Sequence, residues 1–202
     1  MIIQSLLDTD FYKLTMGQVV FFNFPTAWAK YSFTNRGKTQ FPRGFAEALN
    51  IELKKLSYLH LTPEEKNWMQ NNSHFHPQFI EWFNSYKYDL EEVKISQIGE
   101  ELSIIIEGYW YRTIHWEVVL MALVSELYFK ITGQMMDCDA FIRIDSKAKE
   151  LETANALWSD FGTRRRFSFY VQSEVVNRMR NYNGFLGTSN PYLAMLYNVS
   201  AI

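Results

Sequence analysis

DFGTRRR, residues 160–166, leads into an amphipathic helix expected near Val171 to Arg180, and FLGTS, residues 185–189, leads into one near Pro191 to Tyr197. Each segment has the order strand, loop, helix, and two such units in succession are typical of a parallel α/β sheet or barrel. A third strand is expected after Ser200. Because two strands cannot close a barrel, the sequence predicts an α/β fold that contains the opening units of an incomplete, TIM-like α/β barrel.

Residues 1–135 are expected to form a separate N-terminal α/β domain, and residues 136–202 the start of the barrel. Hydrophobic periodicity and turn signals indicate the elements of both parts. The expected helices cover Phe11–Phe22, Phe45–Leu56, a segment that begins at Thr62-Pro63, Pro77–Ser85, Thr113–Ile131 and Ser146–Trp158, and the expected strands cover Ala29–Thr34, Val93–Gln97 and Leu102–Glu107. Asp8 or Asp10 is expected to cap the first helix.

Composition narrows the class of protein. The 202 residues are 48% hydrophobic and 17% aromatic with a formal charge of −2, which argues against disorder and against a general nucleic-acid binder. The N-terminus does not resemble a signal peptide, and the apolar segment 117–131 is too short for a comfortable membrane span. The single cysteine, Cys138, is expected to be a small buried side chain. A reducing compartment, the cytoplasm, and no membrane or nucleic-acid partner are therefore expected.

The arginine cluster at residues 164–166 is the densest chemical signal. Three adjacent guanidinium groups repel one another unless anions or carboxylates share their space, so an oxyanion-rich ligand is one interpretation. A solvated basic turn is the alternative. Phe161 and Gly162 favour a site, because an aromatic ring stacks on a planar ligand and a glycine permits close approach. Loops that follow barrel strands are also where active sites gather.

The loop Gly187-Thr188-Ser189-Asn190 is the second candidate. It offers hydroxyl groups and backbone amides at a helix N-terminus, which suit a phosphate or carboxylate. Its alternative is a plain helix cap formed by Ser189 or Asn190. Tyr12 could serve a ligand, but core packing explains it equally well.

Other chemistry finds little support. His74 and His76 have strand spacing but no further ligand to complete a metal site, so no metal ligand is assigned. His60 and His115 are expected to be ordinary packed or surface residues. Neither a Gly-x-Gly-x-x-Gly fingerprint nor a Walker motif occurs in the sequence.

Four blocks taken in order resemble the nicotinate phosphoribosyltransferases. They are LLDTDFYKL at residues 6–14, WEV at 116–118 before VSE at 124–126, FGTRRRFS at 161–168, and GTSN at 187–190. The resemblance spans nearly the whole chain, and the order of the blocks is more specific than any one of them. It implies the type II phosphoribosyltransferase architecture in a chain about twice this long, usually a homodimer.

The resemblance also implies an activity. Family members transfer phosphoribose from phosphoribosyl pyrophosphate to the ring nitrogen of nicotinate in NAD salvage, with Mg²⁺ and coupled ATP hydrolysis. Nicotinate, phosphoribosyl pyrophosphate and ATP are thus the expected small-molecule partners. Pyrophosphate leaves a sugar of oxocarbenium character, so the protein must orient the reactants and stabilise anionic charge.

Motif positions imply roles for particular residues. Phe161 resembles one face of the nicotinate sandwich, and Tyr12 the other, contributed across the dimer interface. Arg164 is expected to contact phosphate or carboxylate and to be the catalytic residue. Ser189 stands where the pyridine substituent is read, and a serine there favours the acid over the amide. The expected substrate-binding set is Tyr12, Phe161, Gly162, Arg164, Arg165, Thr188 and Ser189.

One departure limits this expectation. The family's Gly-Thr-x-Ala-His-Glu segment, with the histidine that ATP phosphorylates, does not occur among these residues. The chain is therefore expected to be a truncated part of the enzyme and inactive alone. A non-catalytic binding or assembly remnant is the alternative from another class. Nicotinamide and quinolinate phosphoribosyltransferases are closer alternatives, against which Ser189 and the three arginines weigh.

Overall fold

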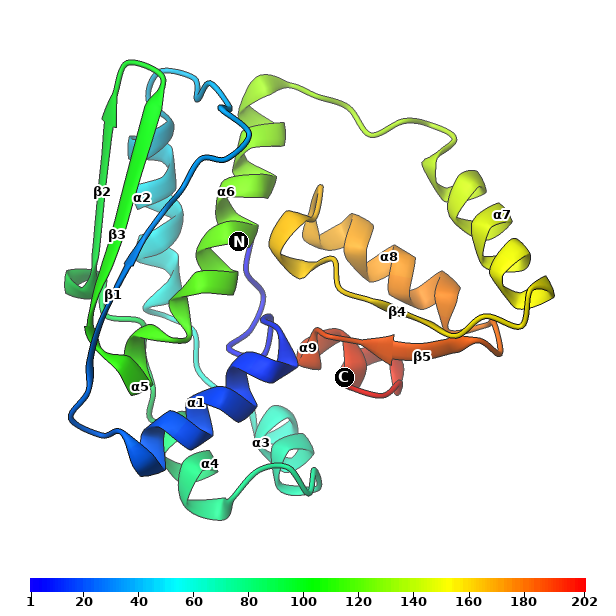
Figure 1. The fold of residues 1–202 in the computed structure, drawn as a ribbon, viewed down its shortest axis with the longest axis horizontal. Coiled ribbons are helices and arrows are strands. Elements are labelled where there is room, and N and C mark those ends of the chain that lie inside the picture. Colours follow the sequence, from blue (N-terminus) through cyan, green and yellow to red (C-terminus); the bar gives the residue numbers. More distant parts are fainter.

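The computed structural model describes residues 1–202 and contains two separate β-sheets (Figure 1). The helices are α1 Phe11–Asn23, α2 Phe45–Leu56, α3 Pro63–Gln70, α4 Pro77–Asn84, α5 Trp110–Thr113, α6 Trp116–Thr132, α7 Ala140–Thr153, α8 Phe169–Met179 and α9 Pro191–Tyr197, with short 3-10 turns η1 Leu90–Glu92 and η2 Thr163–Arg165. The strands are β1 Trp28–Ser32, β2 Val93–Ile98, β3 Glu101–Tyr109, β4 Trp158–Asp160 and β5 Phe185–Thr188.

The first sheet is antiparallel, with the strand order β1-β3-β2. Strands β2 and β3 form a hairpin whose turn contains Gly99 at a positive φ of 60°, a conformation that glycine adopts without a Cβ penalty. Alternate side chains of β3, Leu102, Ile104 and Ile106, are buried on one face of the sheet. This two-residue alternation is what a sheet with one covered face requires.

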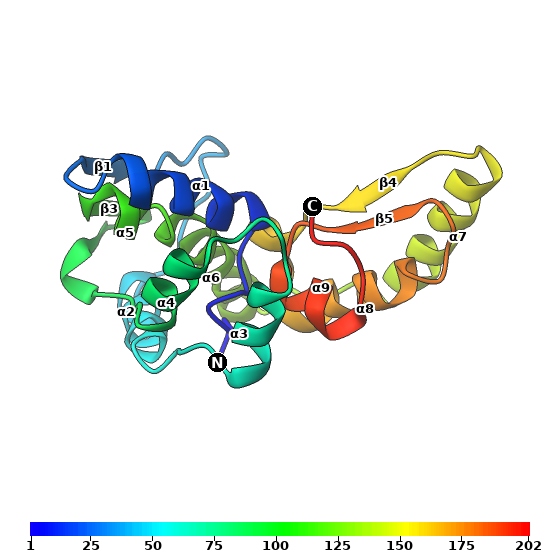
Figure 2. The same cartoon turned by 90° about the horizontal axis from the view of Figure 1, so that it is seen from below.

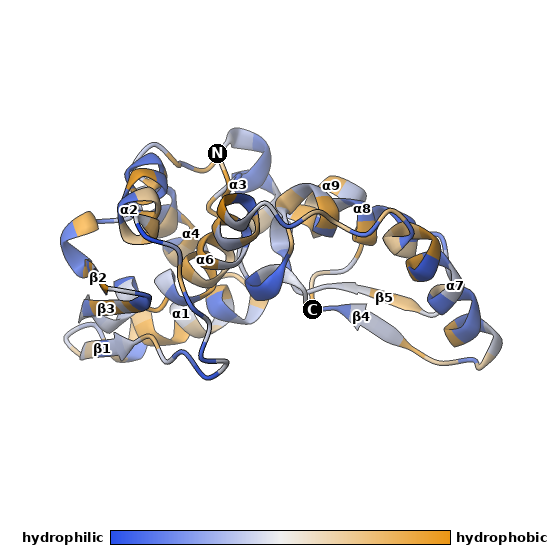
Figure 3. Cartoon of the chain, turned by 90° about the horizontal axis from the view of Figure 1, so that it is seen from above, coloured by the Kyte–Doolittle hydropathy of each residue, from blue (hydrophilic) through white to orange (hydrophobic).

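The main core lies between this sheet and the helices of the first unit. Figure 3 shows hydrophobic segments gathered where α2, α4 and α6 lie together. Large side chains that are almost fully buried come from these helices, among them Phe45, Phe79, Phe83 and Trp116. Burying side chains of this size contributes about 1.5–3 kcal/mol each. The core therefore fixes α6, which also faces the second unit.

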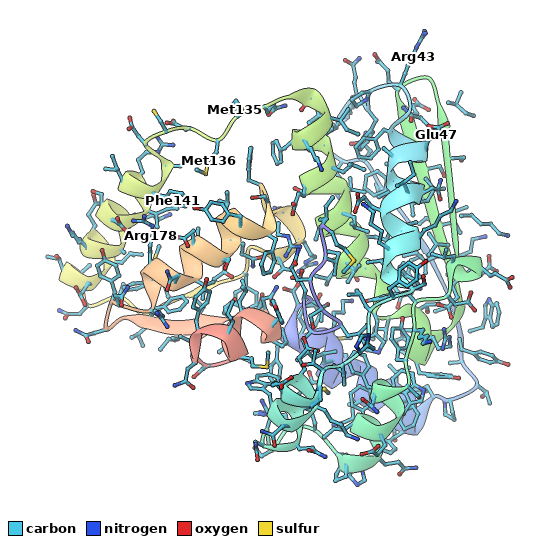
Figure 4. The ribbon with its side chains drawn as sticks, turned by 180° about the vertical axis from the view of Figure 1, so that it is seen from behind. Arg43, Glu47, Met135, Met136, Phe141 and Arg178 are labelled. Atoms are coloured by element: carbon cyan, nitrogen blue, oxygen red, sulfur yellow. The ribbon has the colours of Figure 1, made fainter.

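The second sheet pairs β4 and β5 in parallel, and Thr188 forms a further parallel bridge with Ala201 (Figure 2). Gly187 has a φ of 143°, and a Cβ there would collide with the carbonyl oxygen of Ser200. Helix α7 packs on α8, where the Arg178 guanidinium lies 4.8 Å from the centroid of the Phe141 ring (Figure 4). The parallel order confirms the expected opening units of an α/β barrel.

The N-terminal segment lies between the two units. Ile2, Ile3, Leu6 and Leu7 are all buried, and the backbone amide of Tyr192 in α9 donates to the carbonyl of Leu7 at 3.1 Å. In Figure 1 this segment descends beside α6 before it enters α1 near α9. The first residues of the chain thus join elements that are far apart in sequence.

Most expected elements are present, and three expectations are wrong. The helix placed at Ser146–Trp158 is α7, Ala140–Thr153, and Trp158 begins β4. Neither carboxylate caps α1: Asp10 stands at the N-cap position without a side-chain capping bond, and Asp8 pairs with Arg166. Cys138 is exposed. The residue 135/136 boundary falls in the loop between α6 and α7, and it stays a prediction.

Candidate functional site

A cleft of about 990 Å³ opens between the two units. One wall is β1 with the segment that follows it, residues 31–41, and α6 forms the floor from Glu117 to Phe129. Phe161, Arg164 and Arg165 in the loop after β4 complete the lining. The charged groups around the cleft are three arginines, Arg36 among them, and one carboxylate, Glu117. Its lining is therefore suited to an anion.

The loop after β4 is held in place by Asp160. One oxygen of this carboxylate accepts from the backbone amide of Gly162 at 3.0 Å, and the other accepts from Gln172 at 3.0 Å and from the Thr188 hydroxyl at 2.7 Å. A Cβ at Gly162 would lie 2.8 Å from the Asp160 carboxylate, so the turn needs a glycine here. The loop is thus a preorganised support for the arginines that follow it.

Arg164 lies between two carboxylates at the edge of the cleft. Its Nε is 3.2 Å from Asp10 Oδ2, and its Nη1 donates to Glu117 Oε1 at 3.3 Å. The second oxygen of Glu117 accepts from the nearly buried Lys13 at 2.5 Å. Two cations and two anions therefore alternate along this network. The Arg164 side chain is 40% exposed, which leaves part of the guanidinium open to the cleft.

Asp10 is a carboxylate that is almost fully removed from solvent. It is buried, and burial raises its pKa, whereas the hydrogen bond from Ser189 and the charge of Arg164 act in the opposite direction. The Ser189 hydroxyl donates to Asp10 Oδ1 at 2.7 Å. Burial outweighs these effects, so the pKa of Asp10 lies above its ordinary value, and Ser189, Arg164 and Thr163 oppose that rise.

The three adjacent arginines point to three different environments. Arg166 is buried, with a bidentate pair to Asp8 at 2.7 and 3.0 Å and a further bond to the carbonyl of Ile2. Arg165 is exposed, lines the cleft and makes no ion pair within the chain. An oxyanion ligand is thus not needed to explain Arg166, whose partner is a carboxylate of the protein.

Thr188 and Ser189 are fully buried, with 0% exposure. Thr188 donates to Asp160, and Ser189 donates to Asp10, so neither hydroxyl reaches the cleft directly in this conformation. Asn190 caps α9 by accepting from the backbone amide of Leu193 at 3.1 Å. The capping interpretation of this loop therefore holds for Asn190, whereas Ser189 belongs to the Arg164 network.

The two aromatic residues of the expected sandwich are not paired within the chain. Phe161 is 63% exposed and lines the cleft. Tyr12 is half-buried on α1, and the charged groups of Lys13 and Arg164 lie 5.2 and 5.9 Å from its ring centroid. The structure thus brings Tyr12, Arg164 and Ser189 into one network, and it places Phe161 and Arg165 on the cleft wall.

Sequence reasoning missed the ionic partners of Arg164. The sequence predicts helix capping for Asp10, places Glu117 in a motif without a role, and offers Lys13 only as a possible cation beside Tyr12. The signal for Glu117 and Lys13 was the presence of a charge in an otherwise apolar helix, because a buried charge requires a partner. The contribution of residues 31–41 to the cleft had no sequence signal.

The histidines lie away from the cleft. His115 is buried among Trp82, Phe83 and Tyr86, and His76 caps α4 by accepting from the backbone amide of Gln78. The ligand-type atoms of Asp137, Cys138 and Asp139 lie within 4.8 Å of one another, but all three residues are exposed. No helix combines the length and the apolar character needed to cross a bilayer.

Comparison with known proteins adds an independent line of observation. Residues 7–125 match the nicotinate phosphoribosyltransferase N-terminal domain, and residues 157–202 match the nicotinate phosphoribosyltransferase family. A nicotinate phosphoribosyltransferase of Desulforapulum autotrophicum is 42% identical over 99% of the chain and 53% of its own length. A probable nicotinate phosphoribosyltransferase of Schizosaccharomyces pombe is 37% identical over 97% of the chain and 51% of its own length.

Solved structures agree in fold. The nicotinate phosphoribosyltransferase of Porphyromonas gingivalis superposes with a TM-score of 0.93 at 33% identity, covering 100% of this chain and 53% of that one. A putative nicotinate phosphoribosyltransferase of Saccharomyces cerevisiae gives 0.91 at 32% identity, covering 100% and 54%. The chain spans about half the length of the relatives it matches. Since the N-terminal domain match alone spans more than half of its residues, the chain belongs to the nicotinate phosphoribosyltransferase family.

Proposed function

We propose that the protein carrying this chain transfers phosphoribose from phosphoribosyl pyrophosphate to nicotinate, releasing pyrophosphate and nicotinate mononucleotide in NAD salvage. The observation that carries the proposal is the cleft at the end of β4, where Arg36, Arg164 and Arg165 face one carboxylate, Glu117. A phosphorylated sugar and a pyridine carboxylate are both anionic, so this excess of guanidinium groups suits both reactants. The names of the relatives support the same substrates.

The residues present would act by positioning and by electrostatics. Departure of pyrophosphate leaves positive charge on the sugar and adds negative charge to the leaving group. Arg164, held between Asp10 and Glu117, and Arg165, which has no internal partner, would stabilise that negative charge. The exposed ring of Phe161 would stack on the pyridine and hold its nitrogen towards the sugar. Gly162 and Thr188 would serve indirectly, by shaping and holding the loop.

Tyr12 is proposed as the second face of the sandwich, contributed within a homodimer. Side chains along the outer face of α1 support a partner there, because Met16, Val19 and Phe22 are large, apolar and 40% or more exposed. Phe24 and Trp28 extend this apolar surface beyond the helix. A second protein chain would remove these side chains from water.

Mg²⁺ and ATP are proposed as in the expected family reaction. The residues of this chain do not fit a magnesium cage, because Mg²⁺ favours several oxygen ligands and the one carboxylate at the cleft is paired with Lys13 and Arg164. No step of the mechanism is therefore assigned to the metal here. The exposed thiol of Cys138 supports a reducing compartment such as the cytoplasm.

A product assay tests the proposal. The complete protein is incubated with phosphoribosyl pyrophosphate, Mg²⁺ and nicotinate, with and without ATP, and nicotinate mononucleotide is measured by liquid chromatography. Nicotinamide and quinolinate in parallel reactions test the related pyridine activities. Product from nicotinate is the expected result, and nicotinate binding without any product would instead support a non-catalytic binding protein.

A further inference from the structure

The side chain at position 189 cannot act on a ligand by direct contact in this structure. Ser189 has 0% exposure, its backbone amide donates to the carbonyl of Asp160 at 2.8 Å, and its carbonyl accepts from the amide of Phe11. The residue is therefore fixed on both sides of its Cα. Any influence it has on the cleft must pass through a neighbouring group.

Asp10 is the neighbour that connects Ser189 with the cleft. One carboxylate oxygen accepts from Ser189 at 2.7 Å, and the other lies 3.2 Å from Arg164 Nε. Asp10 forms no capping bond to α1, although it stands at the N-cap position. One oxygen of this buried carboxylate thus faces a buried hydroxyl and the other faces a cleft arginine, and the Thr163 side chain is a further hydrogen-bond partner of the carboxylate.

We propose that Asp10 is a positioning residue through which the buried side chain at position 189 sets the orientation of Arg164. The inference rests on the proposed function, because it assigns the preference for an acidic pyridine to three residues, Ser189, Asp10 and Arg164, rather than to position 189 alone. The hydroxyl fixes the carboxylate, and the carboxylate fixes one edge of the guanidinium. Because Glu117 holds Nη1, the Nη2 group is the part of the guanidinium left for a ligand, and Asp10 and Glu117 together set its direction.

The chemistry of a substitution at position 189 follows from this arrangement. A carboxylate in place of the hydroxyl would stand beside Asp10, and two buried carboxylates in contact cannot both be ionised. One of them would hold a proton, and Arg164 would lose part of its attraction to Asp10. A residue buried beside the cleft would thereby change the charge that Arg164 and Asp10 present at the cleft.

A double-mutant cycle on the complete protein tests this link. The variants are S189A, D10N and the double variant, and the readout is the ratio of kcat/KM for nicotinate to kcat/KM for nicotinamide. Each single substitution is expected to lower the ratio by about fivefold or more, the size of coupling seen between contacting residues. The double variant is expected to match D10N within about twofold, because the path is already broken.

Glu117 supplies a matched control. It also contacts Arg164, at 3.3 Å, but it has no bond to Ser189. The effects of S189A and E117Q on the ratio are therefore expected to multiply. Independent effects of S189A and D10N, or a ratio that neither changes, would overturn the positioning role.

The same experiment separates this inference from the proposed function. Turnover of nicotinate by the unsubstituted protein tests the proposed function. The double-mutant cycle tests whether Ser189 acts on Arg164 through Asp10. Thermal unfolding of each variant shows whether D10N is folded. If D10N does not fold, the cycle is repeated with D10E in its place, alone and combined with S189A. D10E keeps the negative charge but moves the carboxylate. A specificity ratio that D10E leaves unchanged would also contradict the inference.

Discussion

Arg164 and Arg166 stand two positions apart, yet one side chain lies at the edge of the cleft and the other is buried between the two units. Arg166 is buried and holds Asp8 in a bidentate pair, together with the backbone of Ile2 and the side chain of Gln172. Arg164 is 40% exposed and forms ion pairs with both Asp10 and Glu117. The Arg166 guanidinium is enclosed by the protein, with both terminal nitrogens hydrogen-bonded and only its Nε without a hydrogen bond, whereas the Arg164 guanidinium keeps capacity for a ligand. Adjacent identical residues can therefore serve structure and chemistry separately.

Substitution of Arg166 should have the largest effect on stability. R166M leaves Asp8 buried without its counter-charge, which destabilises a protein by about 3–5 kcal/mol. Urea denaturation of the complete protein measures this change. The double variant D8N with R166M should recover part of the loss, because it removes the uncompensated charge. A change below about 1 kcal/mol for R166M would show that the pair does not join the two units.

Substitution of Arg164 should separate activity from stability. R164A is expected to lower kcat/KM for nicotinate by about 10²–10³, as loss of one preorganised donor does. Its free energy of unfolding should fall by less than that of R166M, because the Arg164 side chain is partly exposed and Asp10, which loses one counter-charge, keeps the hydrogen bond from Ser189. Steady-state kinetics and urea denaturation of the same preparation provide both values. Full activity in R164A would remove it from the catalytic site.

His115 extends the comparison to a buried polar group with no partner. Neither ring nitrogen forms a hydrogen bond, and burial, reinforced by Lys13 and Arg112, lowers its pKa from 6.5 to about 3. The unfolded state therefore binds a proton more readily, so stability is complete above pH 6.5 and falls as the pH drops towards 3. At pH 5 the loss should be about 2 kcal/mol.

The pH dependence of unfolding checks this assignment. H115Q should remove the acid-side loss between pH 6.5 and 5, whereas H60Q, at an exposed histidine, should leave it in place. Urea midpoints at several pH values give the slope. An unchanged slope in H115Q would assign the loss to other groups.

Arg165 should show the smallest effect on stability. It is exposed and forms no ion pair within the chain, so R165A should change the free energy of unfolding by no more than about 0.5 kcal/mol. KM for phosphoribosyl pyrophosphate should rise, because a cleft cation is lost. A stability loss as large as that of R166M would mean that Arg165 also has a structural partner.

Local sequence signals predicted much of the fold. Helices α2 and α9 match the expected ranges Phe45–Leu56 and Pro191–Tyr197, and the helix expected to begin at Thr62-Pro63 is α3, where Thr62 and Glu65 form a capping box. These features depend on residues a few positions apart. The error at Trp158 has the opposite cause, because apolar spacing continued past the true end of α7 into a strand.

The candidate site was predicted less completely, for a physical reason. Phe161, Arg164 and Arg165 could be identified because they share one short motif. Asp8 and Asp10 were misassigned as caps because their partners, Arg166 and Ser189, are more than 150 residues away. An aspartate that caps a helix and an aspartate that pairs with a distant arginine cannot be told apart in the sequence. Only the path of the N-terminal segment in the structure distinguishes the two roles.

That path has a consequence for biosynthesis. Residues 2–10 are synthesised more than 150 residues before their partners Arg166, Ser189 and Tyr192. The apolar side chains of Ile3, Leu6 and Leu7 must wait for those partners, and such long-range closure is slow. We therefore expect residues 2–10 to dock only after Tyr192 has been synthesised, and an affinity tag fused before them to slow folding more than one placed in the loop between α6 and α7.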